Sequence, residues 1–133
     1  MTITPIYAGL ATLIFVALSF RVIRARRGAG VALGDGGDSH LRRCQRVHGN
    51  FAEYVPLALL LMALAELQGT SGWLINAIGL ALIAGRLIHA YGVSQEPETI
   101  PIRVAGMSLT FVALITGALT NLGLGGFAAL AAG

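Results

Sequence analysis

Apolar residues dominate the chain in four long stretches, and three short polar stretches separate them. A helix rises 1.5 Å per residue, so about 20 apolar residues cross the hydrocarbon core of a bilayer. Residues 1–20 and 104–133 carry no charged side chain and meet this requirement directly. We therefore predict transmembrane helices at about residues 3–26, 41–67, 73–93 and 102–121. Together they make one all-α domain over residues 1–133, an integral membrane four-helix bundle that runs up, down, up and down.

The connections between the predicted helices are rich in turn-forming residues. Residues 28–40 combine glycines with aspartates and lack apolar periodicity, which is typical of an exposed loop. Residues 68–72 form a turn so short that the third helix has to run back beside the second. Residues 94–101, which place a proline between two glutamates, interrupt the apolar pattern again before the fourth helix.

Composition supports a membrane protein and excludes several other classes. The chain is 56% hydrophobic and 11% charged, and its mean hydropathy is +0.77. All nine basic residues are arginine, but the formal net charge is only +3, which is too low for a nucleic-acid-binding protein. The single cysteine, Cys44, excludes an intramolecular disulfide and a multi-cysteine metal site. We expect no metal, no nucleic-acid partner, and direct contact with membrane lipid.

Arginine is distributed unevenly between the two ends of the predicted bundle. The turn at residues 68–72 has no arginine, whereas Arg103 follows the second large loop. By the positive-inside rule, both large loops face the cytoplasm and both termini face away. In a bacterium this membrane is the inner (plasma) membrane, and a site among these residues opens to the cytoplasm. The first loop region holds seven arginines: Arg21, Arg24, Arg26, Arg27, Arg42, Arg43 and Arg46.

A polar stripe lies at the start of the otherwise apolar second helix. At 100° per residue, Arg46, Asn50 and Glu53 fall within an arc of about 60°, and Tyr54 lies at its edge. Charges at this depth are costly unless they are paired or face a polar cavity. The stripe therefore faces protein or a ligand. A structural clamp between helices and a ligand-binding site both remain open at this point.

Polar residues outside the stripe could each belong to a site or serve only the packing of the helices in the membrane. His48 points about 160° away from Asn50, so it either serves the pocket of a neighbouring subunit or hydrogen-bonds another helix. Arg86 and Arg103 either contribute to a common site or extend to the lipid headgroups. Four residues return to the membrane face that bears the stripe: Arg86, His89, Tyr91 and Arg103.

The sequence resembles the MAPEG family, the membrane-associated proteins of eicosanoid and glutathione metabolism, which includes microsomal glutathione transferases and leukotriene C synthase. The resemblance covers most of the chain and rests on three motifs. One is Val22-Ile23-Arg24-Ala25-Arg26-Arg27 after the first helix. The second is Arg46-x-His48-x-Asn50-x-x-Glu53-Tyr54-x-Pro56. The third is Arg86-x-x-His89 with Gly92, followed by Arg103.

The resemblance implies a homotrimer with three glutathione sites between adjacent subunits, open toward the cytoplasm. It assigns Arg103 as the catalytic residue that stabilises the glutathione thiolate, with glutathione as cosubstrate. Where leukotriene C synthase-like members carry tyrosines near the end of the third helix, this chain has His89 and Val93, so the resemblance does not extend to eicosanoid synthesis. The glutathione-binding residues that it implies are Arg46, Asn50, Glu53, Tyr54 and His89, with Arg26 and His48 from the neighbouring subunit.

The implied chemistry suits these residue types. Arginines bind the two carboxylates of glutathione, and Glu53 accepts from its ammonium group. A thiol with a pKa of about 8.5 needs a nearby cation to ionise at neutral pH. We therefore expect a membrane-embedded glutathione-dependent transferase or peroxidase that acts on lipophilic electrophiles or hydroperoxides. The alternative is a non-catalytic membrane scaffold or accessory protein of the same fold. A small transporter is disfavoured because the centres of the first, third and fourth helices are apolar.

Overall fold

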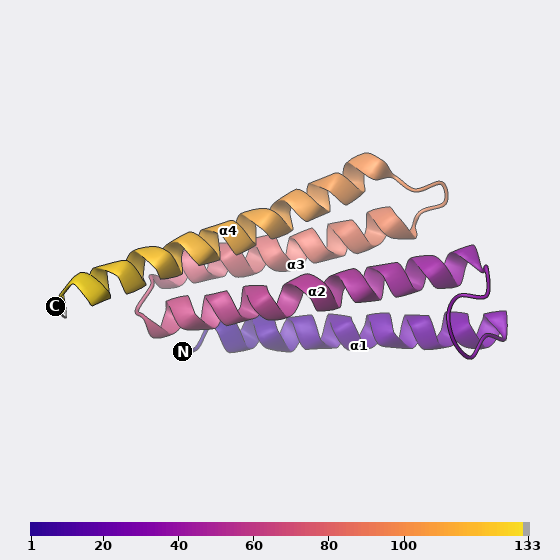
Figure 1. Ribbon diagram of the computed structural model, residues 1–133, viewed down its shortest axis with the longest axis horizontal. Helices are drawn as coiled ribbons and strands as arrows, with labels where there is room; N and C mark the ends of the chain where they lie inside the picture. Colours follow the sequence, from indigo (N-terminus) through magenta and orange to yellow (C-terminus); the bar gives the residue numbers. More distant parts are fainter. Residues whose placement is uncertain (132–133) are drawn as a thin grey trace.

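The computed structural model describes residues 1–131, in which four helices run antiparallel in one bundle (Figure 1). No strand occurs among these residues. The two long loops lie at one end of the bundle, and the N-terminus and the end of the fourth helix lie at the other. These features confirm the predicted all-α, up-down-up-down fold. The helices are α1 (Thr4–Ala29), α2 (Ser39–Leu67), α3 (Gly72–Ser94) and α4 (Ile100–Ala131).

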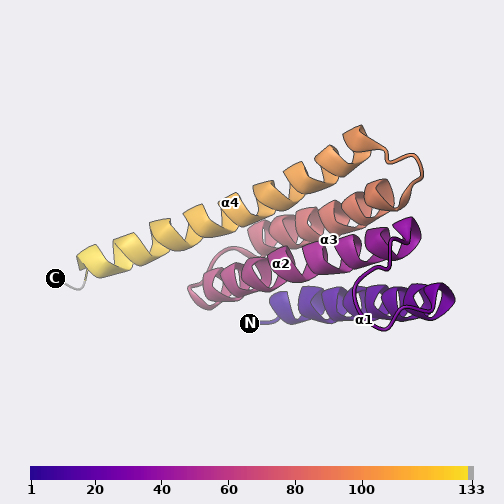
Figure 2. The ribbon, with the colours of Figure 1, turned by 45° about the vertical axis from the view of Figure 1, so that its right-hand side comes forward.

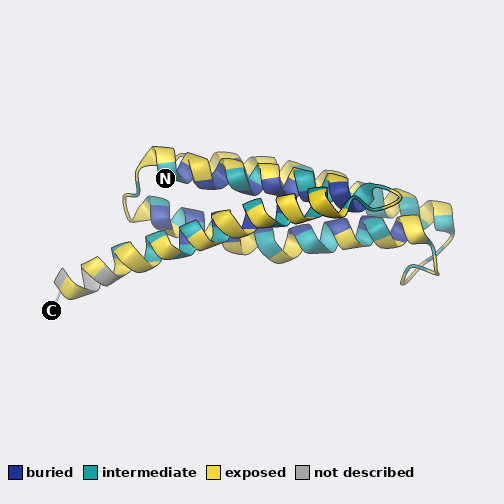
Figure 3. Cartoon of the chain, turned by 90° about the horizontal axis from the view of Figure 1, so that it is seen from above, coloured by how far each residue is buried: buried dark blue, intermediate teal, exposed yellow. Residues whose placement is uncertain are grey.

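The outer surface of the bundle is apolar, as a bilayer requires. All four helices are long and apolar enough to cross a membrane. Buried positions face the inside of the bundle, and exposed positions cover its outside (Figure 3). Large leucines on the outside, such as Leu13, Leu80 and Leu119, are each more than 60% exposed. Lipid tails solvate such a surface far better than water does.

Local sequence explains where two of the helices begin and end. The Asp38 carboxylate accepts a hydrogen bond of 2.6 Å from the backbone N–H of Leu41, so α2 begins at Ser39, two residues earlier than predicted. The fourth helix continues to Ala131, ten residues beyond its predicted end at 121, and projects past the other helices (Figures 1 and 2). Glycine does not end it, because a backbone surrounded by lipid must satisfy its own hydrogen bonds.

Glycines bring α3 and α4 into close backbone contact. A Cβ on Gly92 would lie 2.7 Å from the backbone nitrogen of Arg103, and a Cβ on Gly85 would lie 2.9 Å from the carbonyl oxygen of Gly106. Small residues at such positions let membrane helices approach until their backbones touch. The contact at Gly92 sets the position of Arg103 relative to the end of α3.

A carboxylate at the opposite end of the bundle attaches α1 to α2. Glu66, near the end of α2, accepts hydrogen bonds of 2.8 Å from the backbone N–H groups of both Ile3 and Thr4. These donors are among the unpaired groups of the first turn of α1, and a negative charge is favourable there. Glu66 therefore fixes the register of α1 against α2, far from the arginine-rich end.

Candidate functional site

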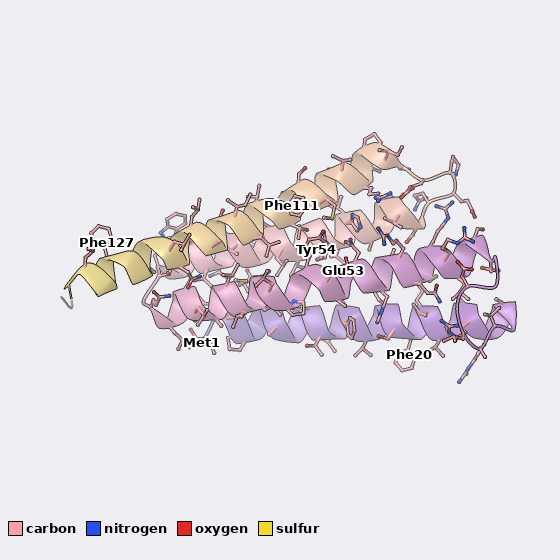
Figure 4. All side chains as sticks on the ribbon, in the orientation of Figure 1. Met1, Phe20, Glu53, Tyr54, Phe111 and Phe127 are labelled. Atoms are coloured by element: carbon pink, nitrogen blue, oxygen red, sulfur yellow. The ribbon has the colours of Figure 1, made fainter. Side chains whose placement is uncertain are left out.

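A cavity of about 580 Å³ opens at the loop end of the bundle, between α2, the end of α3 and the start of α4. Most of the side-chain nitrogen atoms of the molecule gather at this end (Figure 4). Glu98 is the only carboxylate in the lining among the described residues, so basic side chains outnumber acidic ones there. Its four arginines are Arg42, Arg43, Arg46 and Arg103.

The helix period directs the α2 side chains into this cavity. The cap at Asp38 fixes the first turn of α2, and residues at spacings of four and three then share one face. Ser39, Arg43 and Arg46 follow this spacing and line the cavity together. Arg103 comes from the first turn of α4, whose start is fixed by a backbone hydrogen bond from Arg103 to Thr99.

The α3–α4 loop supplies carboxylates to two of the cavity arginines. Glu98 Oε1 lies 2.9 Å from Nη1 of Arg103. Glu96 Oε1 lies 3.2 Å from Nη2 and 3.3 Å from Nε of Arg43, and it also accepts from the Ser39 hydroxyl at 3.2 Å. The loop is therefore tied to both helices that form the cavity.

The α1–α2 loop lies against α2 in a similar way. Arg42 Nε lies 2.6 Å from Asp35 Oδ2, and the hydrogen bond from this guanidinium lowers the pKa of the Asp35 carboxyl. The Gly34 carbonyl accepts from Nη1 of Arg26 at 3.0 Å and from Nε2 of Gln45 at 2.9 Å. Arg26, predicted to bind glutathione in a neighbouring subunit, thus holds its own loop and does not line the cavity of its own chain.

Arg86 is buried beneath the cavity with neutral partners. Its side chain is 2% exposed and donates to Asn50 Oδ1 at 2.7 Å, to Thr110 Oγ1 at 2.9 Å and to Met107 Sδ at 3.1 Å. Its guanidinium carbon lies 5.4 Å from the centre of the Tyr54 ring, a cation–π distance. Within the described part of the chain, no carboxylate lies within 4 Å of it. Extension of Arg86 to the headgroups is therefore wrong.

The predicted α2 stripe divides between the cavity and the outer surface. Arg46 lines the cavity, and Asn50 turns its carbonyl oxygen to Arg86. Tyr54 packs edge-to-face on Phe111 of α4, with 5.8 Å between the ring centres. Glu53 is exposed on α2, and Figure 4 labels it next to Tyr54. Among residues 1–131 its carboxylate has no hydrogen-bond or ion-pair partner.

The two predicted histidines lie away from the cavity. His48 Nε2 lies 3.0 Å from the Ser19 hydroxyl of α1, and its ring stacks on Phe15 with 4.6 Å between the centres. It therefore points away from Asn50, as the helix period predicts. His89 is 4% exposed between α3 and α4, and its Nδ1 donates to the carbonyl oxygen of Arg103 at 3.3 Å. The structure does not bring His89 to the cavity lining.

A second, mainly apolar groove of about 400 Å³ adjoins the cavity along the outer face of α4. Arg103 and Glu98 line both spaces. The other side chains of the groove include Val104, Met107 and Phe111, which follow one face of α4 away from the loops. Arg103 consequently stands between a polar space open to water and an apolar surface at the level of the lipid.

Comparison with known proteins agrees with the four-helix membrane fold. A model of the MAPEG family matches residues 4–123, which include α1 to α3 and most of α4. The chain belongs to the MAPEG family. The inner membrane protein YecN of Escherichia coli strain K12 is 41% identical over 120 residues that cover 90% of each chain, and YecN of strain CFT073, serotype O6:H1, matches equally well. The four apolar helices and these relatives together indicate a multi-pass inner membrane protein.

Several residues that shape the site of this MAPEG chain were not among the predicted site residues. Arg43 could have been found from its spacing, because Ser39, Arg43 and Arg46 recur on one helical face. The sequence places Arg86 at the same membrane face as the stripe, but its partners come from two other helices. No sequence pattern links Glu96 and Glu98 to particular arginines, because a loop has no fixed period.

Proposed function

We propose that this chain is a membrane-embedded glutathione-dependent transferase or peroxidase that acts on lipophilic electrophiles or hydroperoxides. The position of Arg103 carries the proposal. Arg103 lines both the arginine-rich cavity and the apolar groove of α4. A polar thiol bound in the cavity and an apolar molecule arriving from the bilayer would meet there. The cavity volume of about 580 Å³ lies within the usual range for small-molecule sites.

The cavity and the adjoining turns of α2 offer suitable partners for each end of glutathione. Arg43 and Arg46 lie on one face of α2 and present guanidinium groups for its two carboxylates. Asn50 gives its oxygen to Arg86, so its amide nitrogen remains to donate to the ligand. We assign Glu53 to the ammonium group of glutathione, and Tyr54 to the floor of the site.

In the proposed reaction, Arg103 stabilises the thiolate of the bound cosubstrate. The thiolate attacks an electrophilic carbon, a carbon–sulfur bond forms, and the leaving group departs with the bonding electron pair. With a hydroperoxide, the thiolate attacks the terminal peroxide oxygen. The resulting sulfenic acid reacts with a second glutathione, so that two thiols and one hydroperoxide give a disulfide, an alcohol and water.

We further propose that three copies of the chain assemble, with the cavities at the subunit contacts and open to the cytoplasm. The exposed carboxylate of Glu53 supports this assembly, because a charge on the outside of a membrane helix is costly next to lipid. A neighbouring subunit would cover it. In this assembly we assign Arg26 and His48 to the site of the adjacent subunit, for which they would have to leave their contacts with Gly34 and Ser19 of their own chain.

A non-catalytic scaffold is the second candidate, and one observation favours it. Arg43 and Arg103 are already paired with Glu96 and Glu98, so the chain satisfies these charges without a ligand. A scaffold predicts that glutathione neither binds nor raises the thermal unfolding temperature.

The test is titration of the purified protein in detergent with glutathione, followed by calorimetry and by the ultraviolet absorbance of the thiolate. We expect binding and a thiolate signal from the wild type. Arg103→Gln should lose the thiolate signal but keep most of the binding. Arg27→Gln, which removes an exposed arginine from the same end of the bundle, is the matched control and should behave like the wild type. Unchanged thiolate formation in Arg103→Gln would refute the role of Arg103.

A further inference from the structure

Two carboxylates of the chain occupy positions that the carboxylates of an acidic ligand would take. Glu98 pairs with Arg103 at 2.9 Å, and Glu96 pairs with Arg43 at 3.2 Å. Both arginines line the same cavity, and both glutamates belong to the loop between Ser94 and Ile100. The chain therefore supplies its own anions to the site.

The loop is held in this position from both of its ends. The backbone N–H of Thr99 donates to the carbonyl of Gly92 at 3.3 Å, which closes the loop back onto α3. The Ser39 hydroxyl holds Glu96 at 3.2 Å. By contrast, the ion pairs themselves are half open to water: the side chains of Arg103 and Glu98 are 42% and 29% exposed. Water and a soluble anion can therefore reach them.

We propose that Glu96 and Glu98 determine the specificity of the cavity, because an acidic ligand has to displace them from Arg43 and Arg103. This inference rests on the proposed function for the identity of the natural ligand, but not for the competition itself. A ligand with one carboxylate replaces one ion pair by another, so its binding gains little free energy. A ligand with two anionic groups makes both exchanges in one molecule, and the second exchange is intramolecular. In glutarate these groups are its two carboxylates, and in glutathione they are the carboxylate assigned to Arg43 and the thiolate assigned to Arg103. With both glutamates in place, a flexible dicarboxylate is therefore retained in the cavity, whereas a monocarboxylate binds too weakly to be retained.

The exchange also couples ligand binding to the charge of Arg103. While Glu98 is in place, its carboxylate neutralises the guanidinium at 2.9 Å. Displacement of Glu98 leaves this cation to interact with the ligand. Arg103 thus becomes available to the second anionic group of a ligand whose first anionic group already occupies the cavity.

The test compares the dissociation constants of glutarate, butyrate and glutathione for the wild type and for Glu96→Gln, Glu98→Gln and the double variant. Half-exposed ion pairs are weak, so each substitution should tighten glutarate binding about two- to fivefold. Glutarate should gain more than butyrate in the double variant, because glutarate displaces both glutamates of the wild type and butyrate displaces only one. Gln95→Lys is the matched control, because it adds the same unit of charge to the same loop and frees no arginine. Its affinity for glutarate should stay within about twofold of the wild type.

A second measurement needs no variant. Hydrogen exchange at the backbone N–H groups of Gln95, Glu96, Glu98 and Thr99 should speed up when glutarate saturates the wild type, since displacement frees the loop. The inference is overturned if the glutamine variants bind glutarate no more tightly than Gln95→Lys does, if none of the proteins binds glutarate, or if the loop exchanges no faster. Tighter glutarate binding without any glutathione thiolate would contradict the proposed function and support this inference. Formation of the glutathione thiolate, together with unchanged glutarate affinities in the glutamine variants, would support the proposed function and contradict this inference.

Discussion

Gly92 is the residue at which a single methyl group should disturb the site most. A Cβ at this position would lie 2.7 Å from the backbone nitrogen and 3.0 Å from the Cα of Arg103. Ordinary van der Waals contact begins at 3.4 Å, so α4 has to move away by about 0.7 Å at this point. Backbone atoms cannot rotate aside as the end of a flexible side chain can. Gly92→Ala should therefore displace Arg103 from its place between the cavity and the groove.

Gly92→Ala should affect the stability of the protein only slightly and the formation of the thiolate strongly. Overpacking costs about 1–3 kcal/mol, and the better helix propensity of alanine offsets about 1 kcal/mol of it. The variant should consequently fold, with a free energy of unfolding lower by about 0–2 kcal/mol. A displacement of about 1 Å can reduce the rate of a positioned reaction by about 100-fold. We expect the glutathione thiolate formed at saturation to fall at least about tenfold.

The assay measures thiolate absorbance and thermal unfolding for Gly92→Ala beside Gly9→Ala. Gly9 also lies inside a helix, but nothing lies within 4 Å of a Cβ added there. The control should gain slightly in stability and keep the wild-type thiolate signal. A normal thiolate signal in Gly92→Ala would refute the reasoning, because the close approach of α3 and α4 would then not be what positions Arg103.

Three further predictions concern other parts of the bundle. Arg86→Lys keeps the charge but cannot donate to both Asn50 and Thr110 as the guanidinium does. The free energy of unfolding in detergent should therefore fall by about 1–3 kcal/mol, and a wild-type unfolding midpoint would contradict this prediction. Glu66→Ala removes the acceptor of the first N–H groups of α1 and should cost about 1–3 kcal/mol, with faster hydrogen exchange at residues 2–4. Hydrogen exchange at the wild-type rate at these residues would mean that Glu66 does not hold the start of α1. Asp38→Ala removes the cap of α2 and should cost about 0.5–2 kcal/mol, whereas unchanged stability would mean that the hydrogen bond to Leu41 contributes nothing.

The helices could be predicted from sequence because the membrane imposes one simple requirement on all of them. A run of about 20 apolar residues has to be helical in lipid, so the four spans follow from hydropathy alone. The end of α4 could not be predicted in the same way. Glycine and alanine after residue 121 suggest fraying in water, but the lipid environment keeps such a segment helical to Ala131.

Only the part of the site that lies on a single helix, α2, could be predicted from the sequence. The period of α2 places Arg46 and Asn50 on one face and His48 on another, and the structure shows this division. Contacts between helices depend on packing that no local pattern records. Arg86 is therefore buried against Asn50 and not at the headgroups, and His89 lies between α3 and α4 although its motif implied a ligand contact.

The structure of the assembled protein with glutathione bound would test the central claim most directly. We predict ligand density in the arginine-rich cavity of each subunit, with the carboxylates near Arg43 and Arg46 and the sulfur near Arg103. The side of α1 in a neighbouring subunit should close the site. Density in another part of the bundle, or an empty cavity at a glutathione concentration that saturates binding in solution, would contradict the account.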